Sequence, residues 1–331
     1  STLTDLQKAK SRQQTSVGRI NLDNYEIVKL IGVGSFAILY QATDKKNGNC
    51  VLLQVYWTEN GACKKHFYRL ISIGSFNISG AVKLFGYQYP LNKKESRMFN
   101  SWSPKDSPLP SNAELSACFV TEFIPNESLE THLQNYHKGI DKTTLNSTRR
   151  TKIIFGIAAI MKKFHDHKVI HRSLKPSQIL LNEDFEPVIK YSSLSRIITS
   201  PHDMTMGVGT ILYMAPEQYQ KSDQPYGLPV DVYAFAIILY QIFSRQPLLE
   251  TRGKLPTPQQ LMMEVFKGRR PKRDSCIPDC YWQLIERCWK TKPQERPTFA
   301  EITDILKDDQ YILHDCGEPD LKEIFRYQNE I

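Results

Sequence analysis

The stretch KVIHRSLKPSQILLN at residues 168–182 places a polar loop between two short apolar segments. Its basic residues surround a serine, Ser173, and a glutamine, Gln178. Each of the stretches that accompany it along the chain is weak alone, whereas their order and spacing together are too specific for chance. They are LIGVGSFAILY at 30–40, KYSSLSR at 190–196, GTILYMAPE at 209–217, PVDVYAFAIILYQI at 229–242 and ERCWKTKPQERPTF at 286–299.

This series resembles the signature set of the protein kinases and covers about residues 25–310. The resemblance implies an α+β, protein-kinase-like bilobal fold: a small antiparallel β-sheet lobe with one helix, and a larger, mainly helical lobe. The Asp-Val-Tyr-x-Phe and Cys-Trp-x3-Pro-x2-Arg-Pro-x-Phe patterns are similar to the tyrosine-kinase-like group. Lys175 and the Gly209-Thr210 pair are similar to its serine/threonine-type members.

The residue pattern divides the chain in the same way. Apolar and polar residues alternate from Tyr25, which predicts an antiparallel meander, and residues 62–76 have helical spacing. After Pro125 the pattern is mostly helical. We therefore predict the following parts: a polar, basic arm at 1–20, an N-lobe at 25–123 with a surface insertion at 90–116, a C-lobe at 128–310, and a tail at 311–331.

Composition sets broad limits on the kind of protein. The chain has 331 residues, 40% hydrophobic and 24% charged, as is ordinary for a globular protein. No apolar run is long enough to span a bilayer, and no signal peptide is visible, so we expect a cytoplasmic protein with reduced, scattered cysteines. The net charge of +8 is compatible with an acidic partner or a membrane surface, but the spread of Lys and Arg along the chain favours a solvated surface.

The resemblance assigns the catalytic positions to residues that cannot do the usual chemistry. Ser173 stands where the general base, an aspartate, belongs, and a serine cannot accept a proton near neutral pH. Gln178 replaces the metal-binding asparagine, and Tyr191 replaces the metal-binding aspartate. Mg²⁺ prefers hard oxygen ligands in tight octahedral geometry, so we expect no bound magnesium. Lys175 would touch the γ-phosphate in a kinase, but here we favour its interpretation as a polar loop residue.

The nucleotide-binding positions also depart from the family pattern. The strand VLLQ at 51–54 has Gln54 in place of the lysine that holds the phosphates, and Arg69 falls near the position of that lysine's glutamate partner. Leu52 replaces a small residue beside the adenine ring. We therefore expect ATP to bind weakly, and no cofactor is expected. The other equivalents of nucleotide-site residues are Gly32, Gly34, Leu39, Thr121, Glu122, Ile124 and Leu180.

The scaffold positions, by contrast, are retained. Ala215-Pro216-Glu217 and Arg296 are present, and the resemblance implies a buried ion pair between Glu217 and Arg296. Asp231 is present and is expected to hold the backbone of the loop that contains His171 and Arg172. Candidate phosphorylation sites are Thr199, Ser200 and Thr205, although most such hydroxyls are plain loop residues.

These departures predict a pseudokinase that acts as a signalling scaffold or allosteric regulator, with little or no phosphoryl transfer. The alternatives are an atypical active protein serine/threonine kinase and a nucleotide sensor that needs no metal. The expected partners are other signalling proteins, with an active kinase as one candidate, and no nucleic acid. The oligomeric state stays open.

Overall fold

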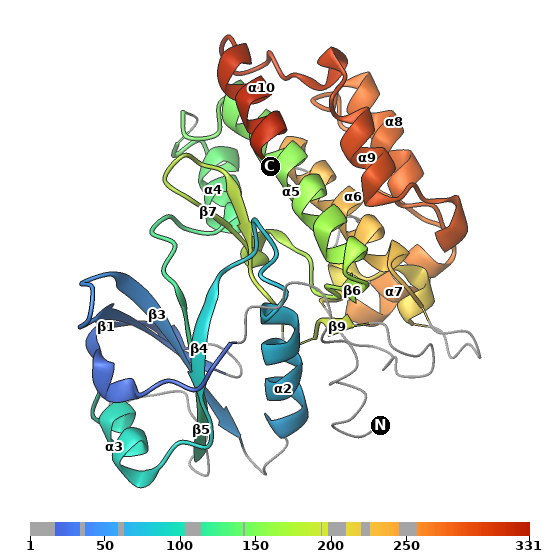
Figure 1. The fold of residues 1–331 in the computed structure, drawn as a ribbon. Coiled ribbons are helices and arrows are strands. Elements are labelled where there is room, and N and C mark those ends of the chain that lie inside the picture. The colour runs from blue at the N-terminus through green and yellow to red at the C-terminus, as the bar shows by residue number, and fades with distance from the viewer. Residues whose placement is uncertain are drawn as a thin grey trace. The chain divides into compact units, whose positions relative to one another are not determined.

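The computed structural model describes residues 17–33, 37–58, 63–102, 114–141, 143–192, 194–197, 210–219, 226–244 and 257–331. The chain folds as two compact units. The N-terminal unit falls within residues 1–77 and 82–124, and the C-terminal unit falls within residues 78–81 and 125–331. Figure 1 shows the elements of both units, and each unit is described by itself below.

A five-stranded antiparallel sheet forms the centre of the N-terminal unit, with the strand order β1-β2-β3-β5-β4 (Figure 1). Along β3, Val51, Leu53 and Val55 are buried, whereas Leu52 and Gln54 between them are half-buried. This alternation confirms the predicted meander, because successive side chains of a strand point to opposite faces of the sheet. The strands are β1 (Tyr25–Val33), β2 (Ala37–Asp44), β3 (Cys50–Thr58), β4 (Leu84–Gln88) and β5 (Glu114–Glu122).

Two helices pack on opposite faces of this sheet. Helix α2 (Cys63–Gly74) places Phe67 against Phe119 of β5, with ring centroids 4.7 Å apart. Helix α3 (Lys93–Trp102) places Phe99 against Tyr40 of β2 at 5.6 Å, and the Tyr40 hydroxyl donates to the Phe99 carbonyl. The strand register pairs Tyr40 with Leu53, and Phe119 with Gln54. Because Leu53 and Gln54 are adjacent in β3 and point to opposite faces of the sheet, Tyr40 and Phe119 also lie on opposite faces. The sheet is thus covered on both sides.

Helix α3 lies within the insertion predicted at 90–116, where the sequence analysis expected only surface loop. Its first turn is closed by a reciprocal pair of hydrogen bonds between Asn92 and Glu95. The Glu95 backbone N–H donates to Asn92 Oδ1 at 2.9 Å, and the Asn92 backbone N–H donates to Glu95 Oε2 at 2.7 Å. This capping arrangement and the fully buried Phe99 explain why so polar a segment is helical.

The C-terminal unit is mainly helical and is built around α6, whose side chains are buried almost throughout. Its helices are α4 (Leu129–His137), α5 (Ser147–Asp166), α6 (Pro229–Phe243), α7 (Pro258–Phe266), α8 (Asp279–Cys288), α9 (Phe299–Ile305) and α10 (Leu321–Glu330). Two short antiparallel pairs of strands accompany the helices. Strand β6 (Val169–Ile170) pairs with β9 (Arg196–Ile197), and β7 (Ile179–Leu181) pairs with β8 (Pro187–Ile189). The α+β fold class predicted from the sequence is confirmed.

The predicted tail at 311–331 contains helix α10, which packs against α5. Lys152 of α5 has a fully buried side chain, and its ammonium lies 2.5 Å from Glu323 Oε1 of α10 and 3.3 Å from Glu186 Oε1. Tyr327 of α10 is buried beside it. A buried ammonium needs such carboxylates, so α10 helps to neutralise a charge inside the C-terminal unit.

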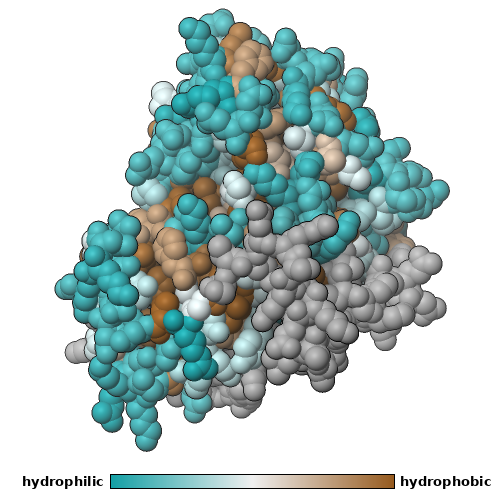
Figure 2. Space-filling view, viewed as in Figure 1, coloured by the Kyte–Doolittle hydropathy of each residue, from teal (hydrophilic) through white to brown (hydrophobic). Residues whose placement is uncertain are grey.

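The visible surfaces of both units are mainly hydrophilic, with scattered hydrophobic residues (Figure 2). Isolated apolar residues on a surface are normal and need no special explanation. Among the described residues, no helix is both long enough and apolar enough to cross a membrane.

Candidate functional site

Asp231 holds the backbone of the loop that follows β6. Its Oδ2 accepts from the His171 backbone N–H at 2.8 Å, and its Oδ1 accepts from the Arg172 backbone N–H at 2.9 Å. Arg172 has a φ of 64°, a left-handed conformation that is unusual for a residue with a side chain. The predicted role of Asp231, at the start of α6, is confirmed.

His171 is fully buried, and its Nε2 lies 2.8 Å from the Lys190 carbonyl oxygen. Nε2 therefore carries the proton of the neutral ring. Burial lowers the pKa of His171, which favours the neutral ring further. His171 is thus a structural residue without access to solvent.

Ser173 and Lys175 line a pocket in the C-terminal unit together with Thr210. The Lys175 ammonium donates to Thr210 Oγ1 at 2.9 Å, so the loop and the GTILYMAPE stretch meet here. The Ser173 hydroxyl makes no hydrogen bond to any residue that the structure describes. Asp231, whose carboxylate also lines the pocket, is 1% exposed and is engaged by backbone donors and by His165 Nε2 at 3.0 Å.

Gln178 and Tyr191 lie on neighbouring segments of the C-terminal unit. The Lys190 backbone N–H donates to the Gln178 carbonyl at 2.9 Å, and the Tyr191 ring lies 5.7 Å from the ring of Phe164. After Tyr191, the Ser195 backbone N–H donates to the Ser192 carbonyl at 2.9 Å, and Ser195 Oγ donates to the His171 carbonyl at 3.0 Å. Leu180, also assigned to the site, is half-buried in β7.

In the N-terminal unit, the side chain of Gln54 is held by its neighbours in the sheet. Its amide N–H donates to Thr121 Oγ1 at 3.2 Å, and its amide oxygen accepts from the Tyr56 hydroxyl at 3.4 Å. Thr121 Oγ1 in turn lies 3.3 Å from the Glu122 carbonyl. The result is a neutral chain of hydrogen bonds across β3 and β5.

Other residues assigned to the nucleotide site share that face of the sheet. Register places Leu39 opposite Gln54, and Leu52 opposite Thr121. The Glu122 carboxylate accepts from the Lys83 backbone N–H. Arg69 is half-buried on α2, Ile124 is half-buried after β5, and Gly32 lies in β1. Gly34 and the hydroxyls of Thr199, Ser200 and Thr205 lie outside the described residues.

Glu217 and Arg296 form the predicted ion pair in the C-terminal unit. The contact is bidentate, with Arg296 Nη1 2.6 Å from Glu217 Oε1 and Nη2 2.8 Å from Oε2. The Arg296 side chain is 0% exposed and that of Glu217 is 17% exposed. Arg296 also donates to the backbone carbonyls of Lys290, at 2.8 Å, and Pro229, at 3.0 Å. This prediction is confirmed.

Comparison with known proteins identifies the family. The family model of the protein kinase domain matches residues 25–309. The chain belongs to the protein kinase family. The bilobal kinase fold predicted from the sequence is thereby confirmed.

The curated relatives of this kinase-family chain are named as protein kinases. A probable LIM domain-containing serine/threonine-protein kinase of Dictyostelium discoideum is 35% identical over 188 residues, which is 57% of this chain and 27% of the relative. The serine/threonine-protein kinase STY17 of Arabidopsis thaliana is 32% identical over 206 residues, 61% of this chain and 33% of the relative. The aligned region is therefore only a part of these relatives.

Kinases act on ATP held by a strand lysine and magnesium. The ligand atoms that this chain offers at the assigned positions fit ATP and magnesium poorly. Gln178 and Tyr191 supply a neutral amide oxygen and a phenol, neither of which carries the charge of a carboxylate. Within the described residues, no group of three or more His, Cys, Asp or Glu side chains is placed to hold a metal ion.

Two features of the site were not found from the sequence. One is the chain of hydrogen bonds through Tyr56, Gln54 and Thr121, which depends on strand register. The other is the contact between Arg172 and the Tyr226 ring, with the guanidinium 5.4 Å from the ring centroid. Burial lowers the pKa of Arg172, which nevertheless stays well above neutrality for a guanidinium. Only Arg172, not Tyr226, carried a signal in the sequence.

Proposed function

We propose that this kinase-family chain is a pseudokinase, which regulates or assembles other signalling proteins and transfers little or no phosphate. The observation that carries the proposal is the catalytic loop: it keeps the scaffold of a kinase but has no group able to act as the general base. Ser173 is a neutral hydroxyl, Asp231 is occupied by backbone donors, and His171 is buried.

The N-terminal unit supports the same proposal. The Gln54 amide cannot supply the positive charge of a lysine, and its side chain is held within the sheet by hydrogen bonds to Thr121 and from Tyr56. Electrostatic stabilisation and metal clamping provide most of the catalysis of phosphoryl transfer. Losing the base, the lysine and both metal ligands therefore removes most of the catalytic machinery, although such losses are not additive.

The first test is phosphate incorporation. Purified protein, incubated with labelled ATP and Mg²⁺ or Mn²⁺ together with general protein substrates, should incorporate no more phosphate than a buffer control. An active serine/threonine kinase prepared in parallel controls for the assay. Autophosphorylation that disappears in a Lys175→Ala variant would mean that the chain is an atypical active kinase, because Lys175 is a retained catalytic-loop residue.

The second test concerns the nucleotide. We expect ATP with magnesium to bind more weakly than about 1 mM, which corresponds to less than roughly 4 kcal/mol of binding free energy. The measurement is a thermal-shift titration with ATP, with and without Mg²⁺, since a ligand that binds the native state raises its melting temperature. Leu52→Ala, which shortens the side chain beside Thr121, should improve the binding of adenosine, whereas Leu53→Ala on the buried face should only destabilise.

The titration also separates the alternatives. A melting shift of several degrees at sub-millimolar ATP, equal with and without magnesium, would favour the metal-independent nucleotide sensor. A shift that requires magnesium would contradict the assignment of Gln178 and Tyr191 as failed metal ligands. If Leu52→Ala does not improve the binding of adenosine, the Leu52 side chain is not what obstructs the nucleotide.

A further inference from the structure

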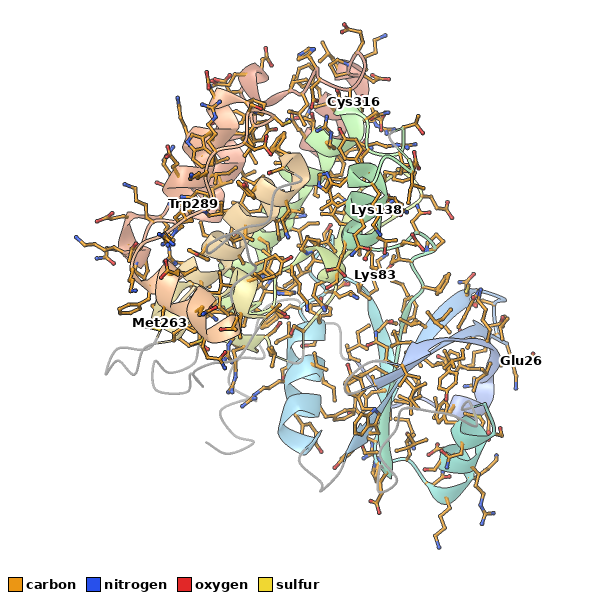
Figure 3. All side chains as sticks on the ribbon, turned by 180° about the vertical axis from the view of Figure 1, so that it is seen from behind. Glu26, Lys83, Lys138, Met263, Trp289 and Cys316 are labelled. Carbon is orange, nitrogen blue, oxygen red and sulfur yellow. The ribbon has the colours of Figure 1, made fainter. Side chains whose placement is uncertain are left out.

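Helix α7 exposes large apolar side chains that nothing in the proposed function uses. Met263 is 60% exposed and Phe266 is 48% exposed. The two are three residues apart and so lie on one side of the helix. Figure 3 labels Met263, which lies at the outer edge of the C-terminal unit. Both side chains are therefore exposed on the surface of the helix.

A basic turn follows directly. Residues 267–273 read KGRRPKR. Gly268 adopts a φ of +84°, and its N–H donates to the Val265 carbonyl at 3.0 Å, while the Arg269 N–H donates to the Glu264 carbonyl at 2.9 Å. This is the Schellman arrangement that ends a helix with a glycine. It fixes the basic residues beside the exposed apolar ones.

One arginine of this turn points inward and anchors it. Arg270 donates to the Val265 carbonyl at 2.9 Å and to the Trp289 carbonyl at 3.0 Å. It also lies 3.3 Å from Thr291 Oγ1, so the turn and the segment 289–292 are held side by side. Figure 3 labels Trp289 on the same side of the unit as Met263. The arrangement is therefore fixed before any ligand binds.

The remaining cations face solvent. Lys267 and Arg269 are 63% and 60% exposed and share one carboxylate, Glu264. Lys272 and Lys290 are exposed, and neither side chain has an ion pair with any residue that the structure describes. We call the whole surface the α7 patch: Met263, Phe266, Lys267, Arg269, Lys272 and Lys290. The α7 patch thus combines two exposed apolar side chains with four cations, two of which share the Glu264 carboxylate.

We propose that the α7 patch binds the surface of an anionic lipid membrane. Apolar side chains that protrude among lysines and arginines suit the boundary between headgroups and acyl chains, where the apolar parts insert and the cations meet lipid phosphates and carboxylates. The charge of the patch decides for this occupant, because its exposed lysines and arginine complement the negative charge of anionic headgroups, while Met263 and Phe266 are exposed beside them. This inference does not depend on whether the chain transfers phosphate.

The test uses the full chain and phosphatidylcholine vesicles with and without phosphatidylserine, in a co-sedimentation assay at low and high salt. We expect binding only to the vesicles with phosphatidylserine, and its loss at high salt. Lys272→Gln/Lys290→Gln should weaken binding about 25-fold, at about fivefold per cation. Met263→Ser/Phe266→Ser should weaken it roughly tenfold.

Matched controls are available on α10, which also exposes apolar and basic side chains. Leu321→Ser/Phe325→Ser and Lys322→Gln/Arg326→Gln should leave binding unchanged, and all variants should melt like the parent. Equal binding to neutral vesicles, or unchanged binding by the α7 variants, overturns the proposal. So does the absence of vesicle binding; patch-dependent binding to polyglutamate would then assign the α7 patch to an acidic protein.

Discussion

Replacing Arg296 with alanine should lower the free energy of unfolding by about 3–5 kcal/mol, because the substitution leaves the Glu217 carboxylate largely buried and without its partner. The Glu217 carboxylate would lose both hydrogen bonds of its bidentate contact. The carbonyls of Lys290 and Pro229 would lose a donor as well. Chemical denaturation of the two proteins, followed by fluorescence or circular dichroism, measures the difference.

The neighbouring pair between Lys292 and Glu295 provides the control. It spans 3.4 Å, and its side chains are 68% and 44% exposed, so Lys292→Ala should change stability by no more than about 0.5 kcal/mol. If Arg296→Ala does not fold, Arg296→Lys keeps the charge while losing the bidentate contact and should be intermediate. An Arg296→Ala protein as stable as the parent would refute the importance of the pair.

The structural contacts of the kinase scaffold could be predicted from the sequence, because they join residues that belong to well-defined motifs. The position of Asp231 beneath the loop of His171 and the pairing of Glu217 with Arg296 were both implied by the resemblance of these motifs to those of protein kinases. The meander also followed, since the alternation along β3 has the period of a strand. The hydrogen bond between Lys175 and Thr210 was not predicted, although both residues lie in recognised motifs.

Helices α3 and α10 were missed because their sequences are mostly polar and their stability comes from caps and from a few buried side chains. A signal was present in each. Asn92 and Glu95 form the capping pair of α3, and Asp320, whose side chain accepts from the Glu323 N–H at 3.0 Å, precedes the apolar side of α10. A search for such N-terminal caps would have found both helices.

The site itself was only partly predictable, since the identity of a residue does not fix the partners of its side chain. The sequence indicated that Gln54 lacks the charge of a lysine, but the hydrogen bonds of its amide to Thr121 and Tyr56 depend on register. Likewise, the basic run KGRRPKR at 267–273 is visible in the sequence and was overlooked, but its position beside segment 289–292 depends on the fold. Segments 267–273 and 289–292 are separate in sequence and are joined by the hydrogen bonds of Arg270 to the Trp289 carbonyl and to Thr291 Oγ1.

Replacing Gly156 with alanine should lower the free energy of unfolding by about 2 kcal/mol, although alanine is the better helix former by about 1 kcal/mol. Gly156 lies inside α5, where α10 and β8 approach the helix backbone. A Cβ at this position would overlap the Tyr327 hydroxyl oxygen and would lie 2.6 and 2.9 Å from Pro187 Cγ and Cδ. Neither the proline ring nor the buried tyrosine can easily move, so crowding should exceed the gain in propensity.

A second substitution distinguishes this crowding from a general effect of alanine. The Tyr327 hydroxyl is buried and has no hydrogen-bond partner among the described residues, so Tyr327→Phe alone should be neutral or stabilising by about 1 kcal/mol. In the Gly156→Ala background, Tyr327→Phe should restore more stability than it adds to the parent, because it also removes the overlapping atom. Ala158→Gly, elsewhere in α5, serves as the control. It should lower the free energy of unfolding by about 1 kcal/mol through helix propensity, and further through the loss of one buried methyl group. Its effect should be independent of Tyr327→Phe. Additive effects of Gly156→Ala and Tyr327→Phe, measured by denaturation of all four proteins of the cycle, would contradict the contact between α5 and α10.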